Sequence, residues 1–497
     1  MNNICLIGFL SPYFYSPLLL RAIPPIFMEN ENDFASERNN NDLAVQRFED
    51  MLRNHKSLFF DVDEFEDLLD FYNSKSNYIK ALEVAKLALE QHPKSSNLLT
   101  AIAQLYLSIH KPQEALKYLN LAESYEPFNF DLIYTKAGVY SQLRKSDKAI
   151  DLYKKALQLA EENDKEDILL QLAFEFENIN KYNDAIQYLK EILLTNKENE
   201  TALYELGFCF DFSEQIDQGR MYFKSFVDQN PYSYIGWYNL GITYGKLDLH
   251  EKAIHCYEFS IAIKEDFSAA YFNKAHSLNK LGQYVEALTC FNETLQYDTE
   301  DSLCYFYIGE SFEKLEDFPK AISYYKRALQ RDEYMADAWY GIASCYYELD
   351  RILDCISYVN KAISYDEYNP EYFYLLGEAQ SENSFDQEAL TSFEKVYELD
   401  PSNPTILIDL ANTAKKLNEH EEATNYFVKG VREQKGNAKL IYNFVAFLLE
   451  KEDLINAMFY LDVALKEHYE ERNELFDAYE EAKYNQQVID LFDYYKK

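Results

Sequence analysis

The sequence predicts an all-α solenoid, a fold in which pairs of helices stack one after another along the chain. Three regularities lead to that prediction: a series of small residues, a second series that follows it at a fixed distance, and the placement of the prolines. Periods of about 20–50 residues are typical of solenoids because a single unit cannot bury its apolar face alone and must stack on its neighbours.

The first regularity is a glycine or alanine that returns every 34 residues, with one longer step of 36 residues between Ala137 and Ala173. Its members are Ala103, Ala137, Ala173, Gly207, Gly241, Ala275, Gly309, Ala343, Gly377 and Ala411. Twelve residues further on runs a second series of small residues: Ala81, Ala115, Ala149, Ala185, Gly219, Ala253, Ala287, Ala321, Cys355, Ala389, Ala423 and Ala457. The two series predict one close helix–helix contact in every repeat.

We number the positions 1 to 34 within each repeat. The repeats then begin at Val62, Ser96, Phe130, Glu166, Glu200, Tyr234, Ser268, Ser302, Ala336, Pro370, Pro404 and Ala438. Positions 4, 7, 8 and 11 fall on one face of a first helix. Positions 20, 24 and 27 fall on one face of a second helix. Small residues at positions 8 and 20 let these helices approach, and large residues at 4, 11 and 24 fill the space between repeats.

Prolines stand where these helices are expected to end or begin. They occupy position 32 or position 1, or the turn between the two helices: Pro93, Pro127, Pro231, Pro401, Pro370, Pro404, Pro112 and Pro319. Because proline breaks a helix interior, this placement supports the same boundaries independently.

The repeat that begins at Tyr234 carries the most complete motif. Trp237, Leu240, Gly241 and Tyr244 fit W-x2-L-G-x2-Y, and Ala253 with Tyr257 fits A-x3-F with tyrosine in place of phenylalanine. The chain therefore resembles tetratricopeptide repeat proteins over about four-fifths of its length. The resemblance implies a right-handed superhelix of about twelve antiparallel helix pairs, and a role in binding other proteins.

The remaining segments flank the array, which spans residues 62–471. Residues 1–61 form an N-terminal extension, with a short helix expected at about 43–55, and residues 472–497 are expected to form a capping helix. The apolar, proline-broken residues 1–27 leave three alternatives open: a signal or anchor, a flexible segment, or an upstream start with Met28 as the first residue. The long step, together with Ile192 and Phe226 at position 27, predicts a local change of twist over residues 157–230.

Composition excludes several function classes. The net charge of −37, from 85 acidic and 48 basic residues, disfavours binding to nucleic acid, which needs clustered Lys and Arg. The seven cysteines and eight histidines lack metal-ligand or disulfide spacings, so no metal or cofactor is expected and the cysteines indicate packing in a reducing compartment. The sequence holds none of the nucleotide-binding, hydrolase or metalloprotease motifs and leaves no non-repetitive segment large enough for a catalytic domain. We expect no enzyme activity.

Function is then expected on the surface. In the resembling family the first helices line a concave groove through positions 2, 5, 6, 9, 12 and 13. Eight repeats have an aromatic residue at position 5, which predicts a ladder for an extended peptide: Tyr134, Tyr204, Tyr238, Phe272, Phe306, Tyr340, Tyr374 and Tyr442. The alternative is that these rings serve local packing. Asn239 and Asn273 at position 6 and Glu310 at position 9 belong to the same candidate groove.

Charge gives the groove a chemical preference. Its positions carry 18 acidic and six basic residues, a balance of −12. An acidic, aromatic-lined groove favours partner segments that carry Lys or Arg beside apolar residues. Lys246, Lys280 and Lys314 occupy position 13 of successive repeats and predict a short basic row that could hold a carboxylate of the partner; the alternative is that they are ordinary exposed lysines.

The sequence therefore predicts a cytoplasmic, non-enzymatic scaffold or adaptor that binds protein segments in this groove. The alternative is an envelope-associated assembly factor that residues 1–27 export or anchor. Partner identity and oligomeric state stay open.

Overall fold

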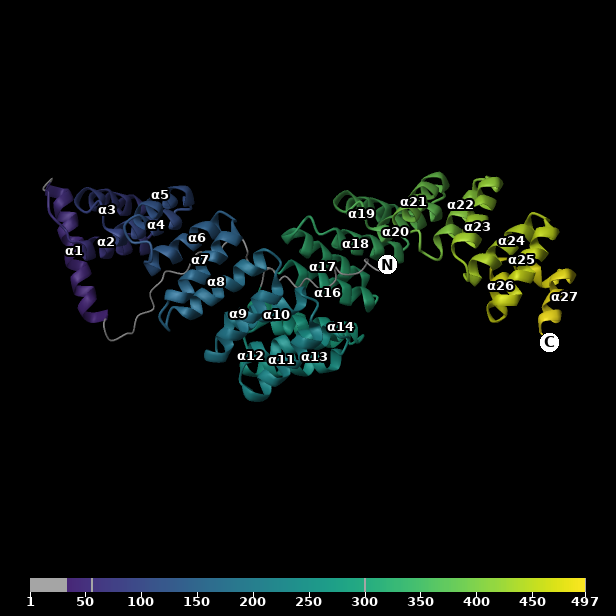
Figure 1. Ribbon diagram of the computed structural model, residues 1–497. Helices are drawn as coiled ribbons and strands as arrows, with labels where there is room; N and C mark the ends of the chain where they lie inside the picture. Colours follow the sequence, from purple (N-terminus) through teal and green to yellow (C-terminus); the bar gives the residue numbers. More distant parts are fainter. Residues whose placement is uncertain (1–33, 55–56, 299–300, 497) are drawn as a thin grey trace. The chain divides into compact units, whose positions relative to one another are not determined.

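The computed structural model describes residues 34–54, 57–298 and 301–496, and within them the regular secondary structure is helical throughout, with no strand. The chain divides into two compact units, Met1–Asn273 and Lys274–Lys497, each of which we describe by itself. In both units the helices follow one another in pairs along the sequence (Figure 1). The predicted all-α fold of stacked helix pairs is confirmed.

The first helices of the twelve repeats begin within two residues of the predicted repeat starts. They are α2 (Val62–Ser74), α4 (Ser96–Ser108), α6 (Phe130–Gln142), α8 (Lys165–Asn178), α10 (Glu200–Phe212), α12 (Tyr234–Lys246), α14 (Ser268–Lys280), α16 (Ser302–Lys314), α18 (Ala336–Glu348), α20 (Pro370–Glu382), α22 (Ile406–Lys416) and α24 (Ala438–Glu450). The second helices are α3 (Tyr78–Gln91), α5 (Pro112–Glu123), α7 (Ser146–Leu159), α9 (Tyr182–Thr195), α11 (Ile216–Gln229), α13 (His250–Ile263), α15 (Tyr284–Tyr297), α17 (Phe318–Arg331), α19 (Ile352–Tyr365), α21 (Asp386–Leu399), α23 (His420–Glu433) and α25 (Leu454–Glu467).

The flanking segments differ in detail from expectation. The helix expected at about 43–55 is α1 (Phe34–Asn54), which begins earlier, and residues 1–27 lie outside the described residues. The C-terminal segment forms two α-helices instead of one, α26 (Asn473–Ala478) and α27 (Gln486–Tyr495), with short 3-10 turns η2 (Tyr469–Glu471) and η3 (Glu480–Tyr484).

The long step is divided between a helix and a loop. Helix α8 has 14 residues where most first helices have 13, and five residues, 160–164, connect it to α7 where four connect α9 to α10. One of the two additional residues therefore lengthens helix α8, and the other lengthens the loop before it. The predicted change of twist over 157–230 stays a prediction.

The residue at position 34 caps the N-terminus of many of the first helices. A Ser, Asn or Asp there accepts a hydrogen bond from a backbone N–H in the first turn of the helix, and so satisfies a donor that the helix itself cannot pair. These caps are Asp61, Ser95, Asn129, Asn199, Ser233, Asp301, Asn369 and Asn437.

The turn between the two helices has one backbone conformation in all twelve repeats, with position 15 in the left-handed region. The residue is glycine only at Gly282, with φ 74°, and the other eleven have φ between 52° and 61°. They are Ser76, His110, Arg144, Asn180, Glu214, Asp248, Glu316, Asp350, Ser384, Asn418 and Glu452. The turn lets the next residue donate back to the carbonyl of position 11, as Lys145 N does to Tyr140 O at 2.9 Å.

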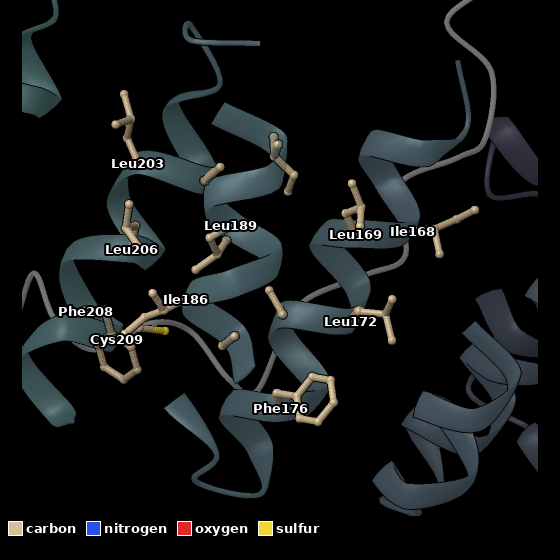
Figure 2. Packing of buried hydrophobic residues seen from close by; sticks show 14 of the residues in the cluster. Ile168, Leu169, Leu172, Phe176, Ile186, Leu189, Leu203, Leu206, Phe208 and Cys209 are labelled. Carbon is tan, nitrogen blue, oxygen red and sulfur yellow. The ribbon is translucent and has the colours of Figure 1, made fainter. Parts of the chain in front are cut away.

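The core forms where each second helix packs between successive first helices. Figure 2 shows α9 between α8 and α10, with Leu189 on α9, Leu169 on α8 and Leu206 on α10; all three are buried. The small residues of the second series are fully buried. At position 8 three of the four glycines, Gly241, Gly309 and Gly377, let an aromatic ring of position 24 approach the backbone, as Tyr257 does at Gly241, whereas Gly207 faces the side chain of Asn239. This close packing is the reason that both series are small.

Candidate protein-binding face

The first-helix face, defined by positions 2, 5, 6, 9, 12 and 13, does not carry a continuous exposed ladder of rings. Four of the eight position-5 aromatics are buried, with exposed fractions of 6% or less: Tyr134, Tyr238, Phe272 and Tyr442. Tyr238 is fully buried and accepts a hydrogen bond from the Asn273 amide at 3.1 Å. The prediction of a ladder is therefore wrong at these four positions, because the rings fill the space between repeats.

The asparagines of position 6 also serve the fold. Asn239 is buried and its amide donates to the carbonyl oxygen of Leu203 at 2.7 Å. Asn273 is half-buried and donates to Ala269 O at 2.9 Å as well as to Tyr238. Neither amide is directed at an outside ligand in this structure.

The other four position-5 rings are half-buried and reach the surface: Tyr204, Phe306, Tyr340 and Tyr374. Three of them belong to the second unit, where carboxyl groups surround them. We define the unit 2 acidic face by the half-buried or exposed residues Phe306, Tyr307, Glu310, Glu313, Asp337, Tyr340, Tyr347, Tyr374, Glu378, Glu382 and Asp409.

Tyr307 and Tyr347 were not among the predicted residues, because they stand at positions 6 and 12. Tyr307 lies edge-on to His276, with ring centroids 5.2 Å apart, and Tyr347 donates to the Glu382 carboxylate at 2.6 Å. The sequence signal that could have found them is the high aromatic content of positions other than 5 in repeats 8 and 9.

Three carboxyl groups of this face, those of Glu310, Glu378 and Asp409, have raised pKa values, chiefly because they are removed from water. Burial raises the pKa of Glu378 to about 7, and the neighbouring Asp409 and Glu382 carboxylates add to the shift. Burial also raises the pKa of Asp409, although hydrogen bonds from Tyr374 and Thr405 oppose it; the Tyr374 hydroxyl lies 3.2 Å from Asp409 Oδ2. A cation placed among these groups would favour their charged forms.

Glu310 lies in a mixed charge environment. Burial raises its pKa, the positive charges of Lys280 and Lys314 lower it, and Glu313 and Asp337 raise it. Lys280 and Lys314 are both exposed. Part of the predicted basic row therefore acts on a carboxylate of the chain itself.

Lys246 has a different partner. Its ammonium group lies 3.1 Å from Asp211 Oδ1, and both side chains are more than four-fifths buried. The same relation, position 12 of one repeat to position 13 of the next, joins Asn73 to Ser108, Tyr347 to Glu382, Ser381 to Lys416 and Lys415 to Glu450. Lys246 thus ties two repeats together, and a role for it in holding a partner's carboxylate stays a prediction.

A second acidic cluster lies on the first repeat. Burial, followed by the charges of Asp63, Asp70, Asp131 and Asp67, raises the pKa of Glu66 to about 7. The residues described here include no group of His, Cys, Asp and Glu arranged to hold a metal ion.

Models of known protein families match four segments of the repeat array. Residues 130–163, 235–267 and 268–301 match one model described as tetratricopeptide repeat, and residues 314–379 match another with the same description. The chain is a tetratricopeptide repeat protein. Proteins of this class mediate protein–protein interactions, and no catalytic domain is evident in the described part of this one.

Several solved structures match the chain at low sequence identity. The Cut9–Hcn1 hetero-tetramer of the APC/C is 13% identical, covers 82% of this chain and 94% of its own, and has a TM-score of 0.40. A tetratricopeptide repeat protein from Parabacteroides merdae is 14% identical over 50% of this chain and 98% of its own, also with a TM-score of 0.40. YrrB, described as having an unusual peptide-binding site, is 19% identical over 37% of this chain and 95% of its own, with a TM-score of 0.32.

The comparison with curated proteins found no match to this tetratricopeptide repeat protein. Within the described residues, none of its helices combines the length and the apolar character that crossing a membrane requires.

The raised pKa of Glu378 makes stability depend on pH. Its pKa is about 7 in the folded tetratricopeptide repeat protein and near its ordinary 4.5 when unfolded, so between these values the folded state binds more protons. The stability that the raised pKa of Glu378 gives to the folded state is fully present below about pH 4.5 and is lost as the pH rises through 7. We expect Glu378→Gln to stabilise unit 2 by about 1 kcal/mol at pH 8 and to leave stability unchanged near pH 4.5. Urea unfolding of both proteins at the two pH values measures this; an equal effect at both would contradict it.

Proposed function

We propose that this chain is a non-enzymatic scaffold whose unit 2 acidic face binds protein segments that carry Lys or Arg beside apolar residues. The observation that carries the proposal is the combination of half-exposed rings and partly desolvated carboxyl groups on consecutive first helices. Phe306, Tyr340 and Tyr374 occupy the same position of three successive repeats, and Glu310 and Glu378 lie one turn further along their helices.

The chemistry favours a basic partner for two reasons. A partner cation restores the charged form of carboxyl groups that burial disfavours, and it can also lie over the face of a neighbouring tyrosine. The net charge of −37 attracts basic segments from a distance, so association should be fast at low salt and slower as salt screens the field.

Binding can be tested on the full chain with 12-residue peptides that carry four Lys or Arg residues among Leu and Ser, with fluorescence anisotropy as the readout. We expect Phe306→Ala/Tyr340→Ala/Tyr374→Ala to weaken binding by about tenfold or more, since aromatic hot spots contribute about 2 kcal/mol each. Glu310→Gln/Glu378→Gln should weaken it less, and should reduce the dependence of binding on salt.

The matched control is Tyr368→Ala, because this ring is 73% exposed and stands in the loop between α19 and α20, outside the residues that define the unit 2 acidic face. It should leave binding unchanged. Peptide affinity that the triple variant retains, or that does not vary between low and physiological salt, would overturn the proposal. Tyr238 and Phe272 are unsuitable for this test because their truncation would open the core.

A further inference from the structure

Helix α17 has an unusual charge for this acidic chain. Its sequence, FPKAISYYKRALQR, contains four basic residues and no acidic one. Among the second helices of the described repeats, no other carries basic residues without acidic ones. Lys320, Lys326, Arg327 and Arg331 are all exposed. The outer side of repeat 8 is therefore locally basic on a protein whose net charge is −37.

Two of these cations lie over aromatic rings instead of beside carboxylates. The Arg327 guanidinium is 4.3 Å from the ring centroid of Tyr305 and 5.1 Å from that of Tyr324, and it donates to the Tyr305 hydroxyl at 3.1 Å. The Lys326 ammonium is 5.8 Å from the ring centroid of Tyr358 in α19. Neither forms an ion pair with any residue that the structure describes.

The same arrangement continues on the next repeat. Tyr358 contacts Trp339, with ring centroids 5.8 Å apart, and Lys361 lies 5.9 Å from the Trp339 ring and 5.1 Å from Tyr365. Lys361 occupies position 26, as Arg327 does in repeat 8, and it too is exposed and without an ion pair among the described residues. Beyond it acids return, since Lys395 at the next position 26 pairs with Glu398 at 2.9 Å. At position 26 of these three successive repeats, the cations without an ion pair among the described residues are therefore those of repeats 8 and 9.

The geometry points to a second interaction surface here, centred on the second helices α17 and α19: Lys326, Arg327 and Lys361, with Tyr324, Tyr358 and Trp339 of α18 beneath them, dock an acidic segment of a partner protein. Charge complementarity selects the occupant. Stacking on tyrosine holds the Arg327 guanidinium in place while leaving N–H groups for a carboxylate, which it can bind with two parallel hydrogen bonds.

A partner protein is the favoured occupant over a second copy of the chain. Two copies, each with a net charge of −37, repel one another as whole molecules, whereas a short acidic segment interacts mainly with charges within a Debye length, about 8 Å at physiological salt. Tyr334, 70% exposed beside Tyr365, offers the same segment an adjacent apolar contact.

The test uses the full chain and a display library of random 12-residue peptides, from which binders are selected, synthesised and measured by fluorescence anisotropy. We expect a class of peptides rich in Asp and Glu whose affinity falls about tenfold with Lys326→Gln/Arg327→Gln/Lys361→Gln. The control is Lys154→Gln/Lys155→Gln, which changes the same positions, 25 and 26, of repeat 3 and should leave these peptides bound as tightly as before. All five side chains are exposed, so circular dichroism should show both variants folded.

Three results would overturn the inference: no acidic class among the binders, acidic peptides that the triple variant binds as well as the wild type, or self-association in sedimentation velocity that the triple variant abolishes. Phe306→Ala/Tyr340→Ala/Tyr374→Ala should leave acidic peptides bound and lose only the basic ones. The failure of either surface is therefore distinguishable from the failure of the other.

Discussion

Replacing Tyr325 with alanine is expected to lower the free energy of unfolding of unit 2 by about 3–5 kcal/mol, the range for truncating a large buried ring. Tyr325 is 2% exposed, and glycines lie against its ring from two successive repeats. A Cβ added to Gly309 or Gly341 would lie 2.7 or 2.6 Å from ring atoms. Because backbone lines the site on both sides, the structure cannot relax into the cavity that alanine leaves.

The hydroxyl of Tyr325 contributes separately. It donates to Glu313 Oε2 at 2.5 Å, while Ser344 donates to Glu313 Oε1 at 2.9 Å. Tyr325→Phe removes one of these two donors and keeps the ring, so we expect it to cost only about 1–2 kcal/mol. Tyr324→Ala is the positional control, because that neighbouring ring is half-buried and its loss should cost about 1 kcal/mol.

Urea unfolding followed by hydrogen exchange measures all three variants, and exchange also locates the effect in the array. The additional opening should concentrate in repeats 8 and 9, since each repeat contacts mainly its neighbours. A cost for Tyr325→Ala no larger than that for Tyr324→Ala would contradict the packing described for Gly309 and Gly341.

Two alanine substitutions in helix α12 are expected to change stability in opposite directions. A Cβ at Gly241 would lie 2.5 Å from Cε1 of Tyr257, a buried ring, whereas a Cβ at Gly245 would meet nothing closer than the Tyr257 hydroxyl at 3.9 Å. Gly241→Ala should destabilise unit 1 by about 1–3 kcal/mol through overpacking. Gly245→Ala should stabilise it by about 0.5–1 kcal/mol, because alanine is the better helix former.

Each substitution is the control for the other, since both stand in the same buried helix and gain the same helix propensity. Repeat 3 has Ala137 at the position of Gly241, against buried Tyr153, so alanine is tolerated where the helices are spaced for it. The stability lost on Gly241→Ala is therefore the free energy needed to move the two helices of this repeat apart. Thermal or urea unfolding checks the result, and two shifts of the same sign would refute the close contact.

Most of the fold could be predicted because one period sets helix length, turn position and contact residues together. A small residue recurs at the position of Ala253 in all twelve repeats and at that of Gly241 in ten, and a large apolar or aromatic residue recurs at that of Tyr257 in eleven, so their roles follow from spacing. The sequence places the two additional residues of the 36-residue step near the start of α8. It does not tell whether they lengthen the helix or the loop before it, because both arrangements preserve the repeat that follows.

The candidate binding face was harder to predict because position 5 lies at the edge of the packed stripe. Whether its ring is buried depends on the residue that the next repeat places beside it: Asn273 bonds Tyr238 inside the core, whereas Phe306 and Tyr340 stay half-exposed. The pairing of Lys246 with Asp211 joins residues 35 positions apart, one more than the period, and a search restricted to single positions does not detect it.

The left-handed residue in every inter-helix turn has a consequence for cooperativity. For a side chain other than glycine this conformation costs about 1 kcal/mol, and eleven of the twelve turns bear that cost. A hairpin excised from the array would lose the flanking helices that hold its turn, and would open. The folding of each hairpin then depends on the hairpins beside it. A substitution that unfolds one hairpin within a unit would therefore destabilise the neighbouring hairpins as well.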